Sequence, residues 1–483
     1  MFSDLKKLGR ESLVYGFSTI LARLLNFFLV PFYTYALTAA EYGVAASVFA
    51  YVAFFNVVFQ YGMDQAYMRF SSDKETGDTL AFSTAFWSVL STSVILSLPL
   101  WLFPAQIAAM AGIGAENAVI VRYCAAVLTL DALMAVPFAR LRMQHRAWFY
   151  VGVRTASIVV NVLANVLLLG VFHFKSDGVF LASLLASGVT FLLLLPCIIQ
   201  ALSFRFPRPL WAGMLHFAWP FVPSGLASTA VQVINRPMML FLTDQATVGI
   251  YQANYRLGVF MMLVVSMFDQ AWRPFFLERK DRPDARQLFA RVLTYFFAGI
   301  VWLSFALSFF IPALVKMPIG HYHLIHPSYW HGLSIMPVVM AGYCFYGLYV
   351  NFMASIVLSK KTPVLLWATL AGAAVNIVLN LVLIPVSPMM GAAWATLFAY
   401  AVMALVLFER GRCCYPIPYE YPRLLKIALA SLVLLAAALA AGHRAGWMLQ
   451  AGLLLAFPIL LAAMSFFDQP EKAAIKRILI GEH

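Results

Sequence analysis

The chain has 483 residues, of which 63% are hydrophobic and only 11% carry a charge, whereas roughly 25% of the residues in a typical soluble domain are charged. This composition excludes an ordinary soluble enzyme or binding domain and indicates a protein that crosses a membrane many times. The net charge of +13 does not indicate a nucleic-acid partner, because the basic residues are scattered through short segments between apolar stretches.

The first apolar stretch runs from about residue 11 to residue 37. It is too long for the apolar region of a signal peptide, and no small-residue cleavage site precedes the next stretch, so we expect it to be the first transmembrane helix. Apolar stretches long enough to cross a bilayer follow along the rest of the chain. About fourteen spans are expected, at residues 11–37, 44–62, 81–103, 118–138, 151–172, 179–200, 214–243, 250–276, 289–315, 333–357, 364–386, 391–408, 425–441 and 447–467.

The basic residues are distributed very unevenly between the two sides of these spans. If the N-terminus lies in the cytoplasm, 23 basic residues fall in the inner segments, and only Lys175, Lys316 and Arg444 fall in the outer ones. Short cytoplasmic loops carry an excess of Lys and Arg in membrane proteins. The bias therefore predicts that both termini are cytoplasmic.

The sequence also contains an internal repeat of long period. Asn161 and Asn165 recur as Asn376 and Asn380, and Asp64 recurs as Asp269, at offsets of 215 and 205 residues. Because each half then holds six helices, an even number, the two halves enter the membrane from the same side, as in transporters with parallel repeats. We expect an all-α polytopic membrane protein with two six-helix lobes in parallel pseudo-repeat, residues 1–200 and 201–408, followed by two C-terminal helices and a cytoplasmic tail, residues 409–483.

Three arginines, Arg23, Arg236 and Arg256, lie more than five residues from either end of an expected span. A cation near the bilayer centre costs at least ~2.5–3.5 kcal/mol on insertion scales, so we expect these side chains to face an internal cavity that accepts an anionic cargo. For Arg236, snorkelling to the membrane surface is the alternative, and for the neighbouring amides it is packing between helices. The candidate substrate-binding residues are Arg23, Asn26, Asn235, Arg236, Gln252 and Arg256.

Three acidic residues also lie in or near the expected spans. Asp131 is deep in the fourth span and is a candidate ion-coupling residue, which either binds a coupling proton or cation or neutralises an arginine across the cavity. Asp64 and Asp269 lie at inner helix ends with Arg69 and Arg273 close by in the sequence. For these two, a structural salt bridge or cap is expected.

Sites of other kinds have weak support in the sequence. The paired asparagines Asn161/Asn165 and Asn376/Asn380 share a helix face at a spacing of four residues, which favours helix packing. The outer loop contains His321, His323, His326 and His331, but without a carboxylate or cysteine we expect an interfacial loop and no metal site. No phosphate loop, nucleophile elbow or zinc-protease motif occurs. No enzyme activity, cofactor or metal is expected.

The second half of the chain resembles a known family over four stretches. The segments Val248–Leu257, Phe268–Phe275, Asn376–Pro385 and Gly391–Thr396 look like the signature stretches of polysaccharide-biosynthesis transporters, the O-antigen-type (Wzx-like) flippases. These belong to the multidrug/oligosaccharidyl-lipid/polysaccharide flippase superfamily. The resemblance covers nearly the whole chain in helix order.

The resemblance implies a V-shaped pair of six-helix lobes that open alternately to the two sides of the bacterial inner membrane. The cargo would be a polyprenyl-diphosphate-linked glycan, moved from the cytoplasmic to the outer leaflet, and a polysaccharide polymerase and assembly proteins would be further partners. The chain is also similar to lipid II flippases, which hold a diphosphate with arginines on helices 1 and 8, where Arg23 and Arg256 match by helix and depth. It departs from them in helix 2, which has Asn56 and Gln60 but no arginine.

Three other functions remain open from the sequence. A cation-coupled multidrug exporter would favour carboxylates in its cavity, which the arginines argue against. A lipid II flippase is disfavoured by the missing arginine in helix 2. A non-transporting scaffold of a polysaccharide assembly complex would tolerate neutral replacements of the cavity residues.

Overall fold

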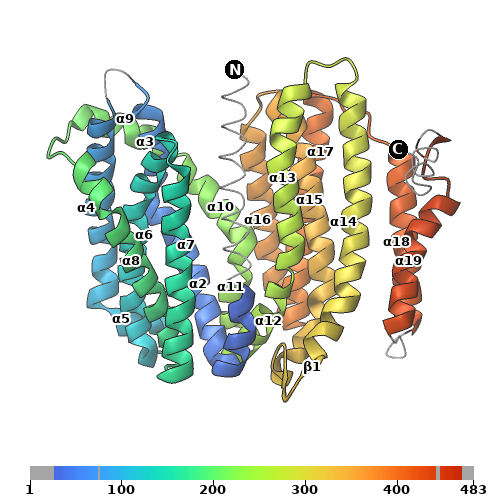
Figure 1. Cartoon of the computed structure of the whole chain (residues 1–483), viewed down its shortest axis with the longest axis horizontal. Helices are drawn as coiled ribbons and strands as arrows, with labels where there is room; N and C mark the ends of the chain where they lie inside the picture. The colour runs from blue at the N-terminus through green and yellow to red at the C-terminus, as the bar shows by residue number, and fades with distance from the viewer. Residues whose placement is uncertain (1–26, 74–76, 442–446, 470, 472–483) are drawn as a thin grey trace. The chain divides into compact units, whose positions relative to one another are not determined.

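The computed structural model describes residues 27–73, 77–441, 447–469 and 471. Helices make up almost all of this part of the chain (Figure 1). The only strands in it, β1 (Pro318–Ile319) and β2 (Tyr322–His323), pair antiparallel in a short hairpin. The fold is therefore helical and polytopic, as expected.

Helices suited to cross a bilayer coincide with the expected spans. Within the described residues, ten helices are long and apolar enough to cross a bilayer. Two further pairs of helices, each bent at a short break, are long and apolar enough if each pair is counted as one span. The first and last of the expected spans correspond to shorter apolar helices, Phe27–Ala36 and Met448–Ala463. The part of the chain that the structure describes thus has ten to twelve spans by length, close to the expected fourteen, and the count of fourteen stays a prediction.

Two of the expected spans are interrupted, which the hydropathy pattern did not predict. Helices α10 (Phe221–Val233) and α11 (Asn235–Leu242) meet at Ile234 with a bend of 57°. Pro237 lies four residues after Val233 and has no N–H to donate to its carbonyl, which weakens the helix at this point and allows the bend. The second interruption is at Gly258, between α12 (Gln245–Leu257) and α13 (Val259–Arg279).

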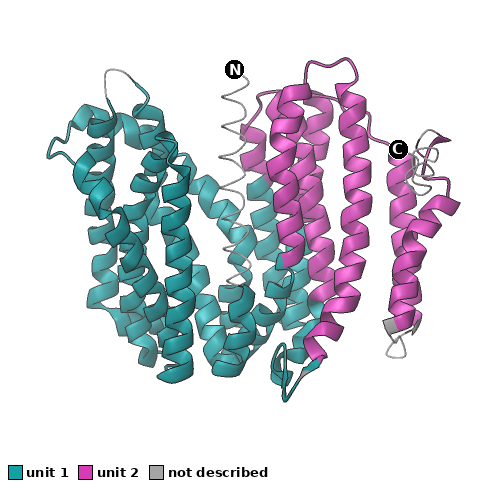
Figure 2. Cartoon of the chain, viewed as in Figure 1, with its two compact units in different colours: residues 1–259, 318–335, 369–399 teal, residues 260–317, 336–368, 400–483 magenta. Residues whose placement is uncertain are grey.

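The chain divides into two compact units (Figure 2). Unit 1 comprises Met1–Val259, Pro318–Ile335 and Thr369–Ala399, and unit 2 comprises Phe260–Met317, Met336–Ala368 and Tyr400–His483. This division follows packing and does not coincide with the boundaries of the two lobes, which stay a prediction.

Unit 1 is built around a helical core. Buried Phe59, Tyr67, Phe82 and Leu128 belong to one hydrophobic cluster that joins helices α2, α3, α4 and α6. Besides α10, α11, α12 and the hairpin, unit 1 contains α2 (Ala39–Gln60), α3 (Met63–Phe70), α4 (Asp78–Leu102), α5 (Pro104–Met110), η1 (Ala115–Asn117), α6 (Ala118–Met143), α7 (Ala147–Asn165), the π-helical η2 (Val166–Val171), α8 (Ser176–Ala201), α9 (Arg208–Ala218), η3 (Pro327–Ile335), most of α16 (Pro363–Leu383) and the first part of α17 (Pro388–Cys414).

Helix α2 has a well-defined start and end, which fix the position of its side chains. Thr38 and Glu41 form a capping box: the Thr38 hydroxyl accepts from the Glu41 N–H, and the Glu41 carboxylate accepts from the Thr38 N–H. This arrangement satisfies two backbone donors that a helix start leaves free. The helix ends at Tyr61 and Gly62, both with positive φ, and glycine takes that conformation at no steric cost.

Unit 2 contains α13, α14 (Ala285–Lys316), α15 (Met336–Leu358), α18 (Tyr421–Ala441), α19 (Trp447–Ala463) and the remaining parts of α16 and α17. Gly347 lets α15 approach α14 closely, because a Cβ at this position would lie 2.8 Å from a methyl carbon of Ile300. The Trp302 indole N–H donates to the Leu454 carbonyl at 3.0 Å and ties α14 to α19.

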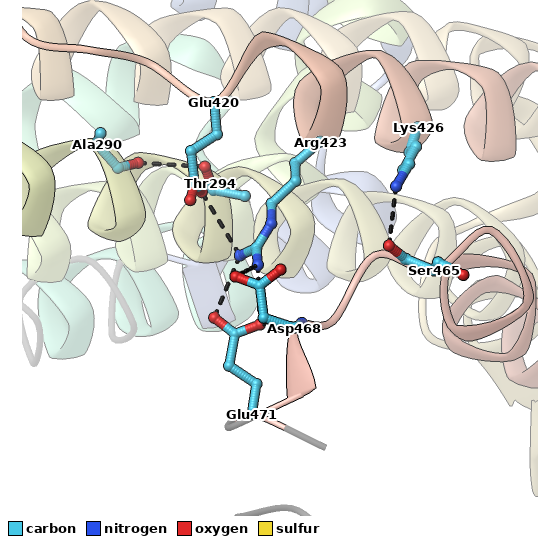
Figure 3. Close-up of polar contacts among 8 residues, drawn as sticks. All are labelled: Ala290, Thr294, Glu420, Arg423, Lys426, Ser465, Asp468 and Glu471. Carbon is cyan, nitrogen blue, oxygen red and sulfur yellow. Dashed lines mark hydrogen bonds and ion pairs between the residues drawn. The ribbon is translucent and has the colours of Figure 1, made fainter. Parts of the chain in front are cut away.

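An ion cluster fixes the start of α18 to the segment after α19 (Figure 3). The Arg423 guanidinium pairs with Asp468 and Glu471, and with Glu420 at 3.6 Å. Burial opposes ionisation of Glu471, but hydrogen bonds from Tyr295, the Asp468 N–H and Arg423, together with the charge of Arg423, outweigh it and lower the pKa of its carboxyl group to about 2. Glu471 therefore remains charged at neutral pH, and all of these residues are already engaged with one another.

Candidate functional site

Arg236 lies on α11 and is buried, with 7% of its surface exposed. Its Nε donates to the Gln252 side-chain oxygen at 2.9 Å, Nη1 donates to the Gln232 carbonyl, and its guanidinium carbon lies 4.8 Å from the centre of the Tyr255 ring. Within the described residues it has no carboxylate partner. Arginine has five N–H donors, and these contacts supply only two acceptors, so its positive charge and some of its donors remain available to a ligand.

Arg256 lies on α12, one helical turn after Gln252, and is half-buried. In the described part of the chain its guanidinium makes no hydrogen bond or ion pair. It interacts electrostatically with two buried phenols, Tyr33 and Tyr42, and Tyr42 also interacts with Arg236. The structure therefore groups Arg236, Gln252 and Arg256 with tyrosines from another part of the same unit.

A close crossing of two helices brings α2 next to α12. A Cβ at Gly43 would overlap the Gln245 carbonyl oxygen, and a Cβ at Gly249 would overlap the Ala39 carbonyl oxygen. Only glycine permits backbones to approach so closely. Tyr42 precedes Gly43 and therefore lies beside the crossing of α2 with the helix that carries Gln252 and Arg256.

The segment η3 covers the end of this crossing that the predicted topology places outside the cell. The Tyr329 hydroxyl donates to the Leu37 carbonyl at 3.2 Å, and the Asn254 amide donates to the Tyr329 carbonyl at 2.8 Å. The rings of Tyr42 and Tyr329 lie edge to face with centres 6.2 Å apart. These contacts enclose Tyr42, of which only 3% is exposed.

Asn235 belongs to a buried amide cluster rather than to the arginine group. Its Nδ2 lies within hydrogen-bonding distance of Tyr251, Thr396 and the Ala392 carbonyl, and its side-chain oxygen accepts from Asn380 at 3.1 Å. Asn376 donates to the Val231 carbonyl. These contacts are those of helix packing, and a substrate role for Asn235 stays a prediction.

Similar contacts occur around the first asparagine pair. The Tyr33 hydroxyl donates to Asn165 at 2.9 Å, and Asn165 donates to the Asn161 carbonyl at 2.8 Å. Asn161 lies 3.5 Å from the Ser183 hydroxyl. Each pair thus uses its four-residue spacing for contacts within its own helix and to neighbouring helices.

Asp131 lies on α6 at a separate position in unit 1. One of its oxygens accepts from the Ser187 hydroxyl at 2.8 Å, and it also interacts with the Asn56 amide and with the charge of Arg154. The Arg154 guanidinium carbon is 4.1 Å from the Phe138 ring centre. Arg154 is not among the candidates from the sequence because it lies near the end of its expected span.

The acids at the helix ends form salt bridges, as expected. Asp269 pairs with Arg273 at 2.9 Å. Asp64 pairs with Arg142 at 3.6 Å, whereas its sequence neighbour Arg69 pairs with Asp73. The partner of Asp64 therefore comes from α6, which packs against α3.

Some expected site residues cannot be placed. Arg23 and Asn26 lie outside the described residues. The described residues contain no group of three or more His, Cys, Asp or Glu side chains suited to hold a metal ion. His323 packs edge-on against Trp330, and His326 hydrogen-bonds Ser328, so these two histidines are engaged in the loop itself.

The sequence pattern did not reveal Tyr42 or the crossing at Gly43 and Gly249. Tyr42 falls two residues before the expected second span, so hydropathy does not mark it as a cavity residue. A signal for the crossing was present, because the two glycines are 206 residues apart, within the offset of the internal repeat.

Comparison with protein families gives one match over more than half of the chain. Residues 36–324 match the family model described as "Polysaccharide biosynthesis protein". Comparison with curated proteins gave no significant match.

Solved structures of the same fold include three transporters. The chain is similar to the structure titled "Lipid II flippase MurJ, inward closed conformation", with a TM-score of 0.76 and 17% identity over 97% of this chain and 100% of that one. It is similar to an inward-facing multidrug resistance MATE family transporter of the MOP superfamily, with a TM-score of 0.60 and 14% identity over 81% and 94% of the two chains. The structure of the MATE multidrug transporter DinF-BH gives a TM-score of 0.57 and 18% identity over 84% and 96%.

Proposed function

Because this chain belongs to the polysaccharide biosynthesis protein family, we propose that it is a flippase for a polyprenyl-diphosphate-linked sugar. It moves the lipid-linked glycan from the cytoplasmic to the outer leaflet by alternating access. Arg236 and Arg256, together with Arg23, bind the anionic headgroup, and Gln252 orients Arg236.

The observation that carries this proposal is the lack of acidic partners around two arginines of one site. Arg236 and Arg256 have no carboxylate partner in the described part of the chain, although α11 and α12 are largely buried. An uncompensated cation in a low-dielectric region is unfavourable. A bound anion would supply the missing charge.

A diphosphate fits these groups chemically. Its anionic oxygens accept charge-assisted hydrogen bonds, and the planar donor fork of arginine matches two such oxygens at once. The hydrogen bond from Arg236 to Gln252 holds the guanidinium in one orientation. The sugar then needs a polar path, while the polyprenyl tail stays in the bilayer.

The orientation of the chain in the membrane is inferred from the loop charges. The excess of basic residues in the expected inner loops supports cytoplasmic termini, and the family match supports a location in the bacterial inner membrane. Polysaccharide polymerase and assembly proteins would take up the exported unit. Lipid II flippases and multidrug transporters have the same fold, and it is the family match that favours a glycan precursor over the other cargoes.

The proposal is tested by replacing Arg256 and Arg236 singly in cells that depend on this protein for their surface glycan. Arg256→Ala should lower glycan export at least tenfold, because a hydrogen bond to a charged group contributes about 1.5–3 kcal/mol. Arg256→Lys should keep part of the export, since the charge survives without the bidentate geometry. Export is measured as surface glycan per cell, normalised to the amount of protein in the membrane.

Arg412→Ala is the matched control, because it removes one exposed positive charge that faces Glu409 at 3.8 Å. It should leave export unchanged. Normal export by an Arg236→Ala, Arg256→Ala double variant would exclude these arginines as the headgroup site. Export of cationic dyes instead of glycan would favour the multidrug transporter.

A further inference from the structure

Tyr42 has a buried hydroxyl group with no hydrogen-bond partner in the described structure. Only 3% of the residue is exposed. Other buried phenols nearby are engaged: Tyr33 donates to Asn165, Tyr251 accepts from Asn235, and Tyr329 donates to Leu37. Buried hydroxyls are normally hydrogen-bonded, and an exception needs an explanation.

The position of this hydroxyl indicates which kind of hydrogen-bond partner is missing. Tyr42 lies in the first turns of α2, next to the crossing at Gly43 that presses α2 against α12. Its ring centre is 5.7 Å from that of Tyr33 and 6.2 Å from that of Tyr329. It interacts electrostatically with the guanidinium groups of Arg256 and Arg236, which are themselves donors and cannot accept its hydrogen bond.

An anion is the ligand that satisfies all three groups together. The two guanidinium groups supply donors only, and the phenol O–H needs an acceptor. A phosphate oxygen has several lone pairs that can accept from all three groups. Arg256 is only half-buried, so an anion can reach the site through the exposed part of this side chain. A small rearrangement of side chains, common when ligands bind, then brings the anion to the phenol.

We propose that the Tyr42 hydroxyl donates a hydrogen bond to a phosphate oxygen of the cargo bound by Arg256. This inference rests on the proposed function and adds a specific donor to it. Because Tyr42 is on α2 and Arg256 is on α12, the diphosphate would bridge these two helices beside their crossing. A neutral donor there contributes hydrogen bonding without adding a further cation to the membrane interior.

The test uses the purified full-length protein in detergent and the Tyr42→Phe variant, which keeps the ring and removes the hydroxyl. Affinity is measured by calorimetric titration with geranylgeranyl diphosphate, and separately with inorganic pyrophosphate, to distinguish a lipid-linked from a free diphosphate. Geranylgeraniol, which lacks the diphosphate, serves as the blank. Tyr42→Phe should weaken diphosphate binding about tenfold, the loss expected for one hydrogen bond to a charged group.

Tyr51→Phe is the matched control on the same helix, because the Tyr51 hydroxyl donates to the Ala111 carbonyl at 3.0 Å. It should lower the melting temperature slightly and leave diphosphate affinity unchanged. Tyr42→Phe should have the opposite pattern: weaker binding with an unchanged or raised melting temperature, since it removes a buried group without a partner.

Unchanged diphosphate affinity in Tyr42→Phe would overturn the inference. A fall in melting temperature like that of Tyr51→Phe would also overturn it, because the hydroxyl would then have a structural partner such as buried water. Arg256→Ala separates the two proposals. If it abolishes binding while Tyr42→Phe does not change it, only the role of Tyr42 fails; if Arg256→Ala binds normally, the proposed headgroup site fails.

Discussion

The arginines of this protein differ in the groups that balance their charge. Arg140 pairs with Asp78 at 2.8 Å, Arg273 with Asp269 at 2.9 Å, and Arg423 with Glu471 at 3.0 Å. Arg236 and Arg256 have no such partner within the described residues. A carboxylate partner cancels most of the electric field of an arginine. Arg236 and Arg256 therefore attract an anionic cargo more effectively than the paired arginines do.

Asp131 is the residue for which a role in ion coupling can be tested directly. Asp131→Asn keeps an oxygen that accepts from Ser187 and removes the charge, so the protein should fold normally. We expect this variant to lose the dependence of glycan export on the membrane ion gradients, measured with ionophores that collapse the proton or the sodium gradient. Asp269→Asn, which alters a salt bridge at a helix end, should respond to ionophores as the unmodified protein does.

An unaltered ionophore response in Asp131→Asn would contradict ion coupling at this position. Asp131 would then serve to balance the charge of Arg154, the other role that its surroundings allow. The sequence left these two roles open, and the structure contains features of both.

At the scale of elements, glycine controls how closely helices approach. In helix α2, Gly43 lies against the backbone of α12, whereas Gly152 in α7 has no atom within 4 Å of the position of a Cβ. Both are helical residues, but only the first is required by packing. The same substitution should therefore have opposite effects at the two positions.

Gly43→Ala should lower the free energy of unfolding by about 1–3 kcal/mol, the usual cost of forcing extra atoms into a packed contact. Gly152→Ala should be neutral or stabilising by up to about 1 kcal/mol, because alanine has the higher helix propensity. Thermal denaturation of the purified variants in one detergent provides the comparison. If Gly43→Ala melts no lower than Gly152→Ala, the close crossing of α2 and α12 does not exist in the folded protein.

Helix interruptions are a second property at this scale. Hydropathy predicted a single span over residues 214–243, but the structure bends by 57° where α10 meets α11. Pro237 was visible in the sequence, yet a proline in a membrane helix is often tolerated without a break. Whether it bends the helix depends on how neighbouring helices satisfy the freed carbonyl.

At the scale of the whole molecule, the arrangement of loops across the membrane follows from charge. Reporter fusions after Arg146, Lys280 and Lys361 should report a cytoplasmic location, and fusions near Gly114, Lys175 and His326 an external one. The physical reason is that basic loops are retained on the cytoplasmic side. Reversal at two or more of these sites would refute the fourteen-span topology.

The sequence by itself determined the class of the protein and the approximate position of the apolar helices in the described residues, and it predicted the arginines that need a counter-charge. These properties depend on local hydropathy and on the cost of burying a cation, so they can be read from short segments. The motifs of the second half also indicated the family that the match over residues 36–324 then established.

Only the tertiary structure decided which side chains meet. It hydrogen-bonded Gln252 to Arg236, paired Asp64 with Arg142, enclosed Asn235 in an amide cluster and left the Tyr42 hydroxyl without a partner in the described structure. These outcomes depend on contacts between helices distant in sequence, such as the crossing at Gly43 and Gly249. Hydropathy and residue type do not encode such contacts, because they arise from the way the helices pack together in three dimensions.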